Sequence, residues 1–285
     1  MQQIIDAHFH IFDPDRFCVE WLKEVDILNR PILLSEFEAL AEGDDYKVVG
    51  AVHVELDTIA AQKKAENDYF VQLAADRSDF VKSVVLYADL LDPDMEQSLA
   101  EYTNKNSVAG VRYILHFDNT PAKTCLNPTF IENVKQLGKM NLHFEACIRP
   151  GELADLYQLA KQCPETLIVL NHMGLPDVTA NIEETDKWKQ GIKLLASLDN
   201  VVCKISGLSS SDVTIITPFV EYCLDLFGEK RVMFASNFPV CNLSITFDDW
   251  TKAMLKIFET RPAKDLFFYK NAMNIYHIGG LSNDQ

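Results

Sequence analysis

Two histidines separated by one residue, His8 and His10, are the first chemically suggestive feature of this sequence. They follow an apolar run typical of a β-strand, and residues at positions i and i+2 of a strand lie on one face. Two imidazoles on one face form half of a metal site, and neutral imidazole is a common zinc ligand. The pair therefore predicts a metal site or, without a metal, direct hydrogen bonding to a substrate.

Other ionisable and amide side chains stand late in further apolar runs of strand length, where their type could support acid–base chemistry or anion binding. These residues are Glu55, Arg112, His116, Glu145, His172 and Asn237. A single buried histidine is often structural, but most of the seven histidines fall in or just after such runs. The clustering favours a common functional site.

Eight apolar runs could position these side chains, and segments with the 3.6-residue spacing of amphipathic helices separate most of them. The runs span residues 4–12, 48–56, 81–90, 108–115, 142–148, 167–173, 201–208 and 231–239. The helical segments span residues 58–75, 93–104, 128–139, 151–162, 184–197 and 218–228. This alternation predicts an α/β protein with one domain over residues 1–285, a (β/α)8 TIM barrel.

A doubly wound open sheet is the alternative fold, but it favours a glycine-rich phosphate loop after the first strand, where this chain has His8, Phe9 and His10. In a (β/α)8 barrel the active site lies at the carboxyl ends of the strands, so the polar residues above should converge there. Residues 13–45 and 175–186 are long enough to cover such a site.

Charge and composition limit the partners. The chain has 42 acidic against 26 basic residues and a formal net charge of −16, which opposes binding to nucleic acid or an anionic membrane. It has no apolar run of the roughly 18 residues needed to span a membrane. Its seven scattered cysteines are typical of reduced thiols. We expect a cytoplasmic protein with a small-molecule substrate, and homo-oligomer formation is left open.

Five segments together resemble the amidohydrolase superfamily. They are residues 4–10 (IIDAHFH), 110–112 (GVR), 171–176 (NHMGLP), 204–208 (KISGL) and 233–240 (MFASNFPV). Their order and content are similar to amidohydrolase family 2, and within it to the group of 2-pyrone-4,6-dicarboxylate lactonase and sugar-acid lactonases. The resemblance spans nearly the whole chain.

The resemblance implies a hydrolase that opens a cyclic ester, a lactone, of an acidic or sugar-acid substrate. It implies that Arg112, His116 and Glu55 bind the substrate. Members of the group differ in whether they need a divalent metal ion. If one is bound here, we expect a single ion, zinc by preference, on His8 and His10 with an oxygen ligand from Glu55 or Glu145, and we expect no organic cofactor. No lysine ends the fourth strand to bridge two metals, so a binuclear site is not expected.

The chain departs from the family pattern at two positions, because Asn171 and Asn237 stand where aspartate is usual. Asn237 can bind a water or a substrate oxygen but cannot accept a proton near pH 7. We therefore expect another catalytic base, with Glu145 preferred, since burial beside few cations would raise its pKa, and His172 second. A metal-dependent decarboxylase of the same superfamily and a catalytically impaired ligand-binding barrel are the alternative functions.

Overall fold

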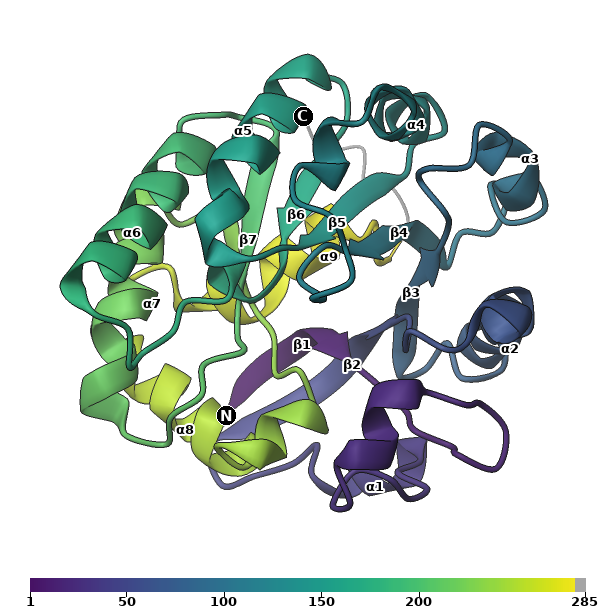
Figure 1. Cartoon of the computed structure of the whole chain (residues 1–285). Helices are drawn as coiled ribbons and strands as arrows, with labels where there is room; N and C mark the ends of the chain where they lie inside the picture. The colour runs from purple at the N-terminus through teal and green to yellow at the C-terminus, as the bar shows by residue number, and fades with distance from the viewer. Residues whose placement is uncertain (280–285) are drawn as a thin grey trace.

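The computed structural model describes residues 1–279, and in it all eight apolar runs are strands of one parallel sheet (Figure 1). Neighbours in the sheet follow the chain order from β1 to β8. The strands are β1 (Gln2–Phe9), β2 (Tyr46–Val54), β3 (Val81–Tyr87), β4 (Val108–Ile114), β5 (His143–Cys147), β6 (Ile168–Leu170), β7 (Val201–Ile205) and β8 (Val232–Phe234). The fold is the predicted (β/α)8 barrel.

The barrel closes between β1 and the segment that follows β8. The Phe238 carbonyl accepts from the His10 amide at 2.7 Å, and the Asn237 amide donates to the His8 carbonyl at 2.9 Å. Deeper in the same seam, the buried Asp6 carboxylate accepts both the backbone amide and the hydroxyl of Ser236. This closure excludes the open doubly wound sheet and brings the ends of β1 and β8 together.

Helices surround the sheet (Figure 1). They are α1 (Leu34–Ala39), α2 (Lys63–Asp76), α3 (Met95–Leu99), α4 (Pro128–Lys139), α5 (Leu153–Gln162), α6 (Ile182–Ala196), α7 (Val213–Phe227), α8 (Phe247–Ile257) and α9 (Asn271–Ile275). Helix α4 has the predicted bounds, because Asn127 caps its first turn and proline is favourable at the first position. Helix α7 begins at Val213 instead of the predicted residue 218, because Asp212 caps it and Pro218 lies inside it.

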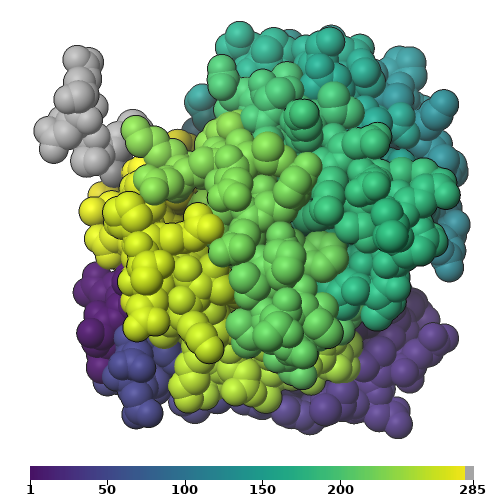
Figure 2. Space-filling model, turned by 90° about the vertical axis from the view of Figure 1, so that its left-hand side faces the viewer, coloured from purple at the N-terminus to yellow at the C-terminus, as the bar shows by residue number. Residues whose placement is uncertain are grey.

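Apolar side chains from opposite sides of the barrel meet in its interior. Ile5, Val52, Val169 and Val202 belong to one buried cluster, which also includes Tyr276 from the segment after α9. Figure 2 shows the yellow C-terminal part of the chain beside the purple N-terminal part, and α9 contacts β1. The C-terminal segment therefore contributes to the barrel interior.

No helix within residues 1–279 is long and apolar enough to cross a membrane. The domain predicted over residues 1–285 includes a last stretch, residues 280–285, that lies outside the described part of the chain.

Candidate active site

A cavity of about 350 Å³ opens at the carboxyl ends of the strands. Its polar lining includes five predicted site residues: His10, Arg112, His116, His172 and Asn237. Much of its remaining wall is apolar, and Phe12 and Trp21 come from the long segment after β1, as expected for a covering segment. The other three predicted residues, His8, Glu55 and Glu145, are buried behind this lining.

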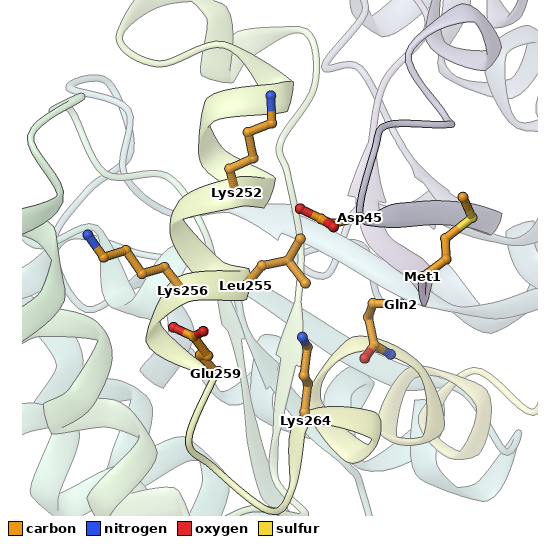
Figure 3. Close-up of a pocket in the computed structure, with 8 residues that line it drawn as sticks. All are labelled: Met1, Gln2, Asp45, Lys252, Leu255, Lys256, Glu259 and Lys264. Atoms are coloured by element: carbon orange, nitrogen blue, oxygen red, sulfur yellow. The ribbon is translucent and has the colours of Figure 1, made fainter.

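A cavity of about 520 Å³ lies near the start of β1 (Figure 3). Lysines 252, 256 and 264 and the N-terminal Met1 line it together with Asp45 and Glu259. None of the predicted site residues contributes to it. Because (β/α)8 enzymes place their chemistry at the carboxyl ends of the strands, the cavity lined by His172 and Arg112 is the candidate active site.

The two histidines of β1 lie side by side, with His8 Nε2 at 3.1 Å from His10 Nε2. His10 Nδ1 is 2.8 Å from the Val54 carbonyl, which can only accept, so neutral His10 carries its proton on Nδ1. His10 Nε2 then accepts from the Nε2 hydrogen of His8. The Lys204 ammonium, 3.3 Å from His8 Nδ1, requires the same state of His8, because an ammonium can only donate.

Both imidazoles are held neutral. Burial is the largest cause, and it lowers the pKa of His10 to about 3, with the Arg112 charge as the next contribution. Burial and the Lys204 charge likewise hold the pKa of His8 well below its ordinary value. The pair therefore carries no charge near neutral pH. Its two N–H groups donate to His10 Nε2 and to the Val54 carbonyl.

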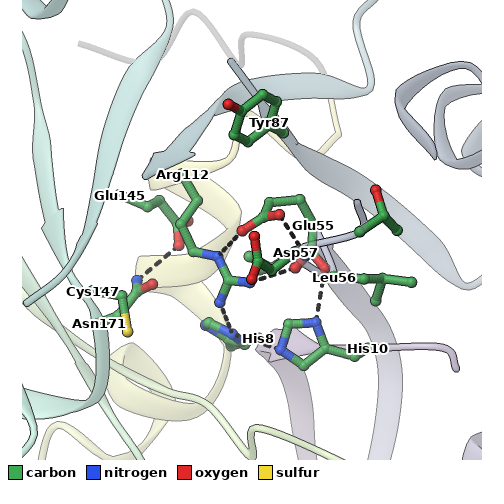
Figure 4. Close-up of polar contacts among 12 residues, drawn as sticks. His8, His10, Glu55, Leu56, Asp57, Tyr87, Arg112, Glu145, Cys147 and Asn171 are labelled. Atoms are coloured by element: carbon green, nitrogen blue, oxygen red, sulfur yellow. Dashed lines mark hydrogen bonds and ion pairs between the residues drawn. The ribbon is translucent and has the colours of Figure 1, made fainter. Parts of the chain in front are cut away.

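Arg112 reaches across from β4 to the end of β2 (Figure 4). Its Nε donates to Glu55 Oε1 at 2.7 Å, and its Nη2 donates to the Glu55 carbonyl. Burial would raise the pKa of Glu55, but Arg112 and Lys63 outweigh it and lower the pKa to about 2. Arg112 Nη1 lies 3.5 Å from His8 Nε2, which is itself a donor in the state derived above. Nη1 thus has no acceptor among residues 1–279.

The surroundings of Glu145 differ from those predicted. Its carboxylate is paired with Lys204 at 2.6 Å and accepts further hydrogen bonds from Asn171, Tyr276 and the ring of His143. Burial raises the pKa of Glu145, but Lys204 and His143 outweigh it and hold that pKa below its ordinary value. The expectation of few cations and a raised pKa is therefore wrong, because the long lysine of β7 reaches the carboxylate inside the barrel.

Glu145 also shows why Asn171 stands where the family pattern has aspartate. The Asn171 amide donates to Glu145 Oε2 at 2.8 Å, whereas a carboxylate there would repel Glu145. The sequence alone did not single out Tyr276, whose hydroxyl donates to Glu145 Oε1 at 2.7 Å across 131 positions of the chain. No periodicity or motif signals that contact.

Replacing Tyr276 by phenylalanine should lower the free energy of unfolding by about 1.5–3 kcal/mol, the usual worth of a hydrogen bond to a charged group. The ring remains to fill the barrel interior, so the change removes only the donor to buried Glu145. Urea unfolding measures the effect. Tyr269→Phe is the matched control, because Tyr269 also packs against the interior cluster and has no side-chain hydrogen bond within residues 1–279. Equal stabilities of the two variants would contradict the assignment.

His172 sits on a strained turn directly after β6. Residues 172–175 all have positive φ, with His172 at +52° and Met173 at +53°, a conformation that costs non-glycine residues free energy. Trp188 of α6 donates to the Met173 carbonyl at 2.7 Å and helps to hold this turn. Ser206 Oγ lies 2.7 Å from His172 Nδ1, which leaves Nε2 for the cavity.

Gly207 leaves the space that the His172 ring fills. An added Cβ at Gly207 would lie 2.6 Å from the Cβ of His172, and φ is +76°. We expect Gly207→Ala to displace the ring and lower kcat about 100-fold, since misplacing a catalytic group by 1 Å can cost that much. Gly228→Ala is the control, because φ there is +72° but no heavy atom lies within 4 Å of the added Cβ. Steady-state kinetics and thermal unfolding separate displacement from backbone strain. Equal activities would show that His172 is not held by this contact.

His116 and Asn237 complete the polar lining. Burial lowers the pKa of His116 to about 4, and its Nδ1 is 3.4 Å from Cys147 Sγ. Asn237 is half-buried with φ at +61°, and its side-chain amide makes no hydrogen bond within the described residues. Both side chains can therefore bind a substrate or a water.

The residues present do not fit the predicted divalent ion. The described chain has no group of three His, Cys, Asp or Glu side chains that could hold a metal. The lone pair of His8 faces the Lys204 ammonium, and that of His10 faces the His8 N–H group. Glu55 and Glu145, the expected oxygen ligands, are paired with Arg112 and Lys204 instead, so neither carboxylate is free to serve as the third ligand in this arrangement.

Comparison with known proteins agrees with the fold. The sequence model of the amidohydrolase family matches residues 5–278. An uncharacterised protein of Sinorhizobium fredii is 30% identical, over 96% of this chain and 98% of its own. L-fucono-1,5-lactonase of Burkholderia multivorans is 27% identical, over 90% of this chain and 89% of its own.

A solved amidohydrolase from Burkholderia multivorans, crystallised with bound zinc, has a TM-score of 0.86 and 22% identity and covers 97% of this chain and 99% of that one. At that identity the similarity concerns the fold. The family model covers both the β1 histidines and the closing segment after β8. This chain is therefore an enzyme of the amidohydrolase family.

Proposed function

We propose that this enzyme hydrolyses the lactone of a sugar acid. One observation carries the proposal: Arg112, with an N–H group that lacks an acceptor among residues 1–279, and His172, a neutral imidazole, line the same cavity. Hydrolysis of a cyclic ester needs a donor for the carbonyl oxygen and a base for water, and these two side chains supply them. The L-fucono-1,5-lactonase similarity supports the same reaction class.

The charges around the cavity favour an uncharged substrate over one with a free carboxylate. Arg112 is paired with Glu55, Lys63 with Asp57 and Lys204 with Glu145. The imidazoles that line the cavity are neutral because burial lowers their pKa. Beside this cavity, no cation among residues 1–279 is left unbalanced for a substrate carboxylate. A sugar lactone is neutral, and the acid formed from it is negatively charged, so a chain with net charge −16 favours release of the product.

The carbonyl oxygen is the atom that gains charge as water attacks. In the proposed complex it accepts a hydrogen bond from Arg112 Nη1, with the other two guanidinium nitrogens fixed on Glu55. This donor is in place before the reaction and cannot lose its proton near neutral pH, which is the arrangement that stabilises an oxyanion. Glu55 then orients Arg112, instead of contacting the substrate as the sequence suggested.

His172 is the proposed base, in place of Glu145. Its Nε2 removes a proton from water as the water oxygen bonds to the carbonyl carbon. The same proton then passes to the ring oxygen as its bond to that carbon breaks, which yields the open hydroxy acid. Burial and the charges of Arg112 and Lys204 keep the pKa of His172 well below 6.5, so the imidazole is in its basic form at neutral pH. In this proposal Asn237 and His116, which line the same cavity, bind the water or substrate hydroxyls.

The purified enzyme should be tested on three groups of compounds: neutral five- and six-membered sugar lactones, lactones with a free carboxylate, and dihydroxybenzoates. Acid release reports lactone opening, and carbon dioxide release reports decarboxylation. We expect turnover of neutral lactones with kcat/KM at least tenfold above that of the carboxylated ones. Carbon dioxide release without lactone opening would support the decarboxylase instead. Ligand binding without turnover would support the impaired barrel.

A further inference from the structure

Lys204 makes contacts that the proposed reaction does not use directly. It is fully buried, and its ammonium lies between a carboxylate and an imidazole, at 2.6 Å from Glu145 Oε2 and 3.3 Å from His8 Nδ1. Burial of a lysine costs free energy and lowers the pKa of Lys204 to about 8. Packing alone does not explain a buried charge at this position, because an apolar side chain would fill the space without this cost.

We propose that Lys204 is the built-in cation of this active site, a positioning residue that fixes the tautomers of His8 and His10 and takes the place of a bound divalent ion. This inference concerns the site of the proposed lactonase. Its kinetic test rests on the proposed function, whereas its NMR and zinc tests do not. The geometry carries it: a metal ion bridges a carboxylate and an imidazole through their lone pairs, and the ammonium does so here through N–H donors.

The fixed tautomers follow from a chain of hydrogen bonds that runs in one direction. Lys204 donates to His8 Nδ1, His8 Nε2 donates to His10 Nε2, and His10 Nδ1 donates to the Val54 carbonyl. Each ring has one donor and one acceptor in use. The one hydrogen of His8 Nε2 is thereby directed at His10, so Arg112 Nη1, 3.5 Å from His8 Nε2, is the donor that remains for an oxygen with developing negative charge.

The Glu145 carboxylate, which binds the Lys204 ammonium, is itself held by other groups. Three neutral donors, from Asn171, His143 and Tyr276, also hold the Glu145 carboxylate, so its position does not depend on the lysine alone. Arg112 is the second cation beside His8, and Glu55 balances it. With both carboxylates engaged by cations, a divalent ion would have to displace Lys204 to gain a ligand.

The test uses histidine-specific nitrogen NMR of the full-length enzyme, which reports the protonated nitrogen of each ring. We expect His8 to be protonated on Nε2 and His10 on Nδ1, and we expect zinc chloride to leave both resonances unchanged. Lys204→Met should leave His8 Nδ1 without its donor and shift the resonance of that nitrogen, allow zinc to shift both histidines, and lower kcat roughly 10- to 100-fold, as for loss of an orienting partner. Lys187→Met on the exposed face of α6 is the matched control and should behave as the unmodified enzyme.

Removing only the lysine leaves Glu145 buried without its cation, which can prevent folding. The double variant Glu145→Gln/Lys204→Met removes both charges and carries the NMR test of His8 Nδ1 in that case. His8 protonated on Nδ1 in the unmodified enzyme, or zinc bound there by His8 and His10, would overturn the proposal. An unchanged His8 Nδ1 resonance in the folded variants would do so as well. These readouts need no substrate, so they fail or succeed separately from the lactonase assignment.

Discussion

Replacing His172 by asparagine is expected to lower kcat roughly 10²- to 10⁴-fold on the best lactone, the usual contribution of a general base. The change removes Nε2 from the cavity, and asparagine tolerates the positive φ of this position better than most residues. KM should change less than kcat, because the lost proton transfer is made only during the reaction. Steady-state kinetics with circular dichroism of the folded variant measures the effect.

His277→Asn is the matched control, because His277 also has positive φ and lies exposed outside the cavity. The pH profile gives a second reading. Only the neutral imidazole can accept a proton, and its pKa is lowered by burial and by Arg112 and Lys204. Activity should therefore persist as pH falls through 6.5 and decline only below it. A His172→Asn enzyme with most of its kcat would show that the base is another group.

Changing Arg112 to lysine should lower kcat roughly 10²- to 10³-fold, the measured range for losing one oxyanion donor. Lysine keeps the charge but has a single nitrogen, which Glu55 would bind, so no donor remains for the carbonyl oxygen. Arg30→Lys, an exposed partner of Glu36, is the control. If Arg112→Lys retained the parent kcat, Arg112 would be no more than the internal partner of Glu55.

The barrel could be predicted from the sequence because each of its strands and helices is signalled by neighbouring residues. Each strand is an apolar run, and helix α4 carries its own cap and first-turn proline. Helix α7 shows the limit of such signals. Proline is typical of a first helical turn, but the Asp212 cap sets the start earlier and leaves Pro218 inside the helix. A proline alone therefore does not decide at which of two residues a helix begins.

The sequence predicted those parts of the site that depend on spacing within a strand and on the geometry of the barrel. Spacing along β1 was enough to place His8 beside His10, and barrel geometry brought His172 and Arg112 to one cavity. The direction of the pKa shift of Glu145 could not be predicted from the sequence, because the groups that decide it come from β7, from Asn171 after β6 and from the segment after α9. One lysine reaching across the interior reversed the direction of the shift. Such contacts between distant strands leave no trace in local sequence patterns.

The assignment of a neutral-lactone hydrolase is tested most directly by proton release in a pH-stat. The measurement follows a sugar lactone with the unmodified enzyme and with His172→Asn in parallel. We predict saturable acid release by the unmodified enzyme, at least 100-fold faster than by the variant, as expected for loss of its base. Acid release by the unmodified enzyme no faster than the uncatalysed rate, across five- and six-membered lactones, would contradict the assignment.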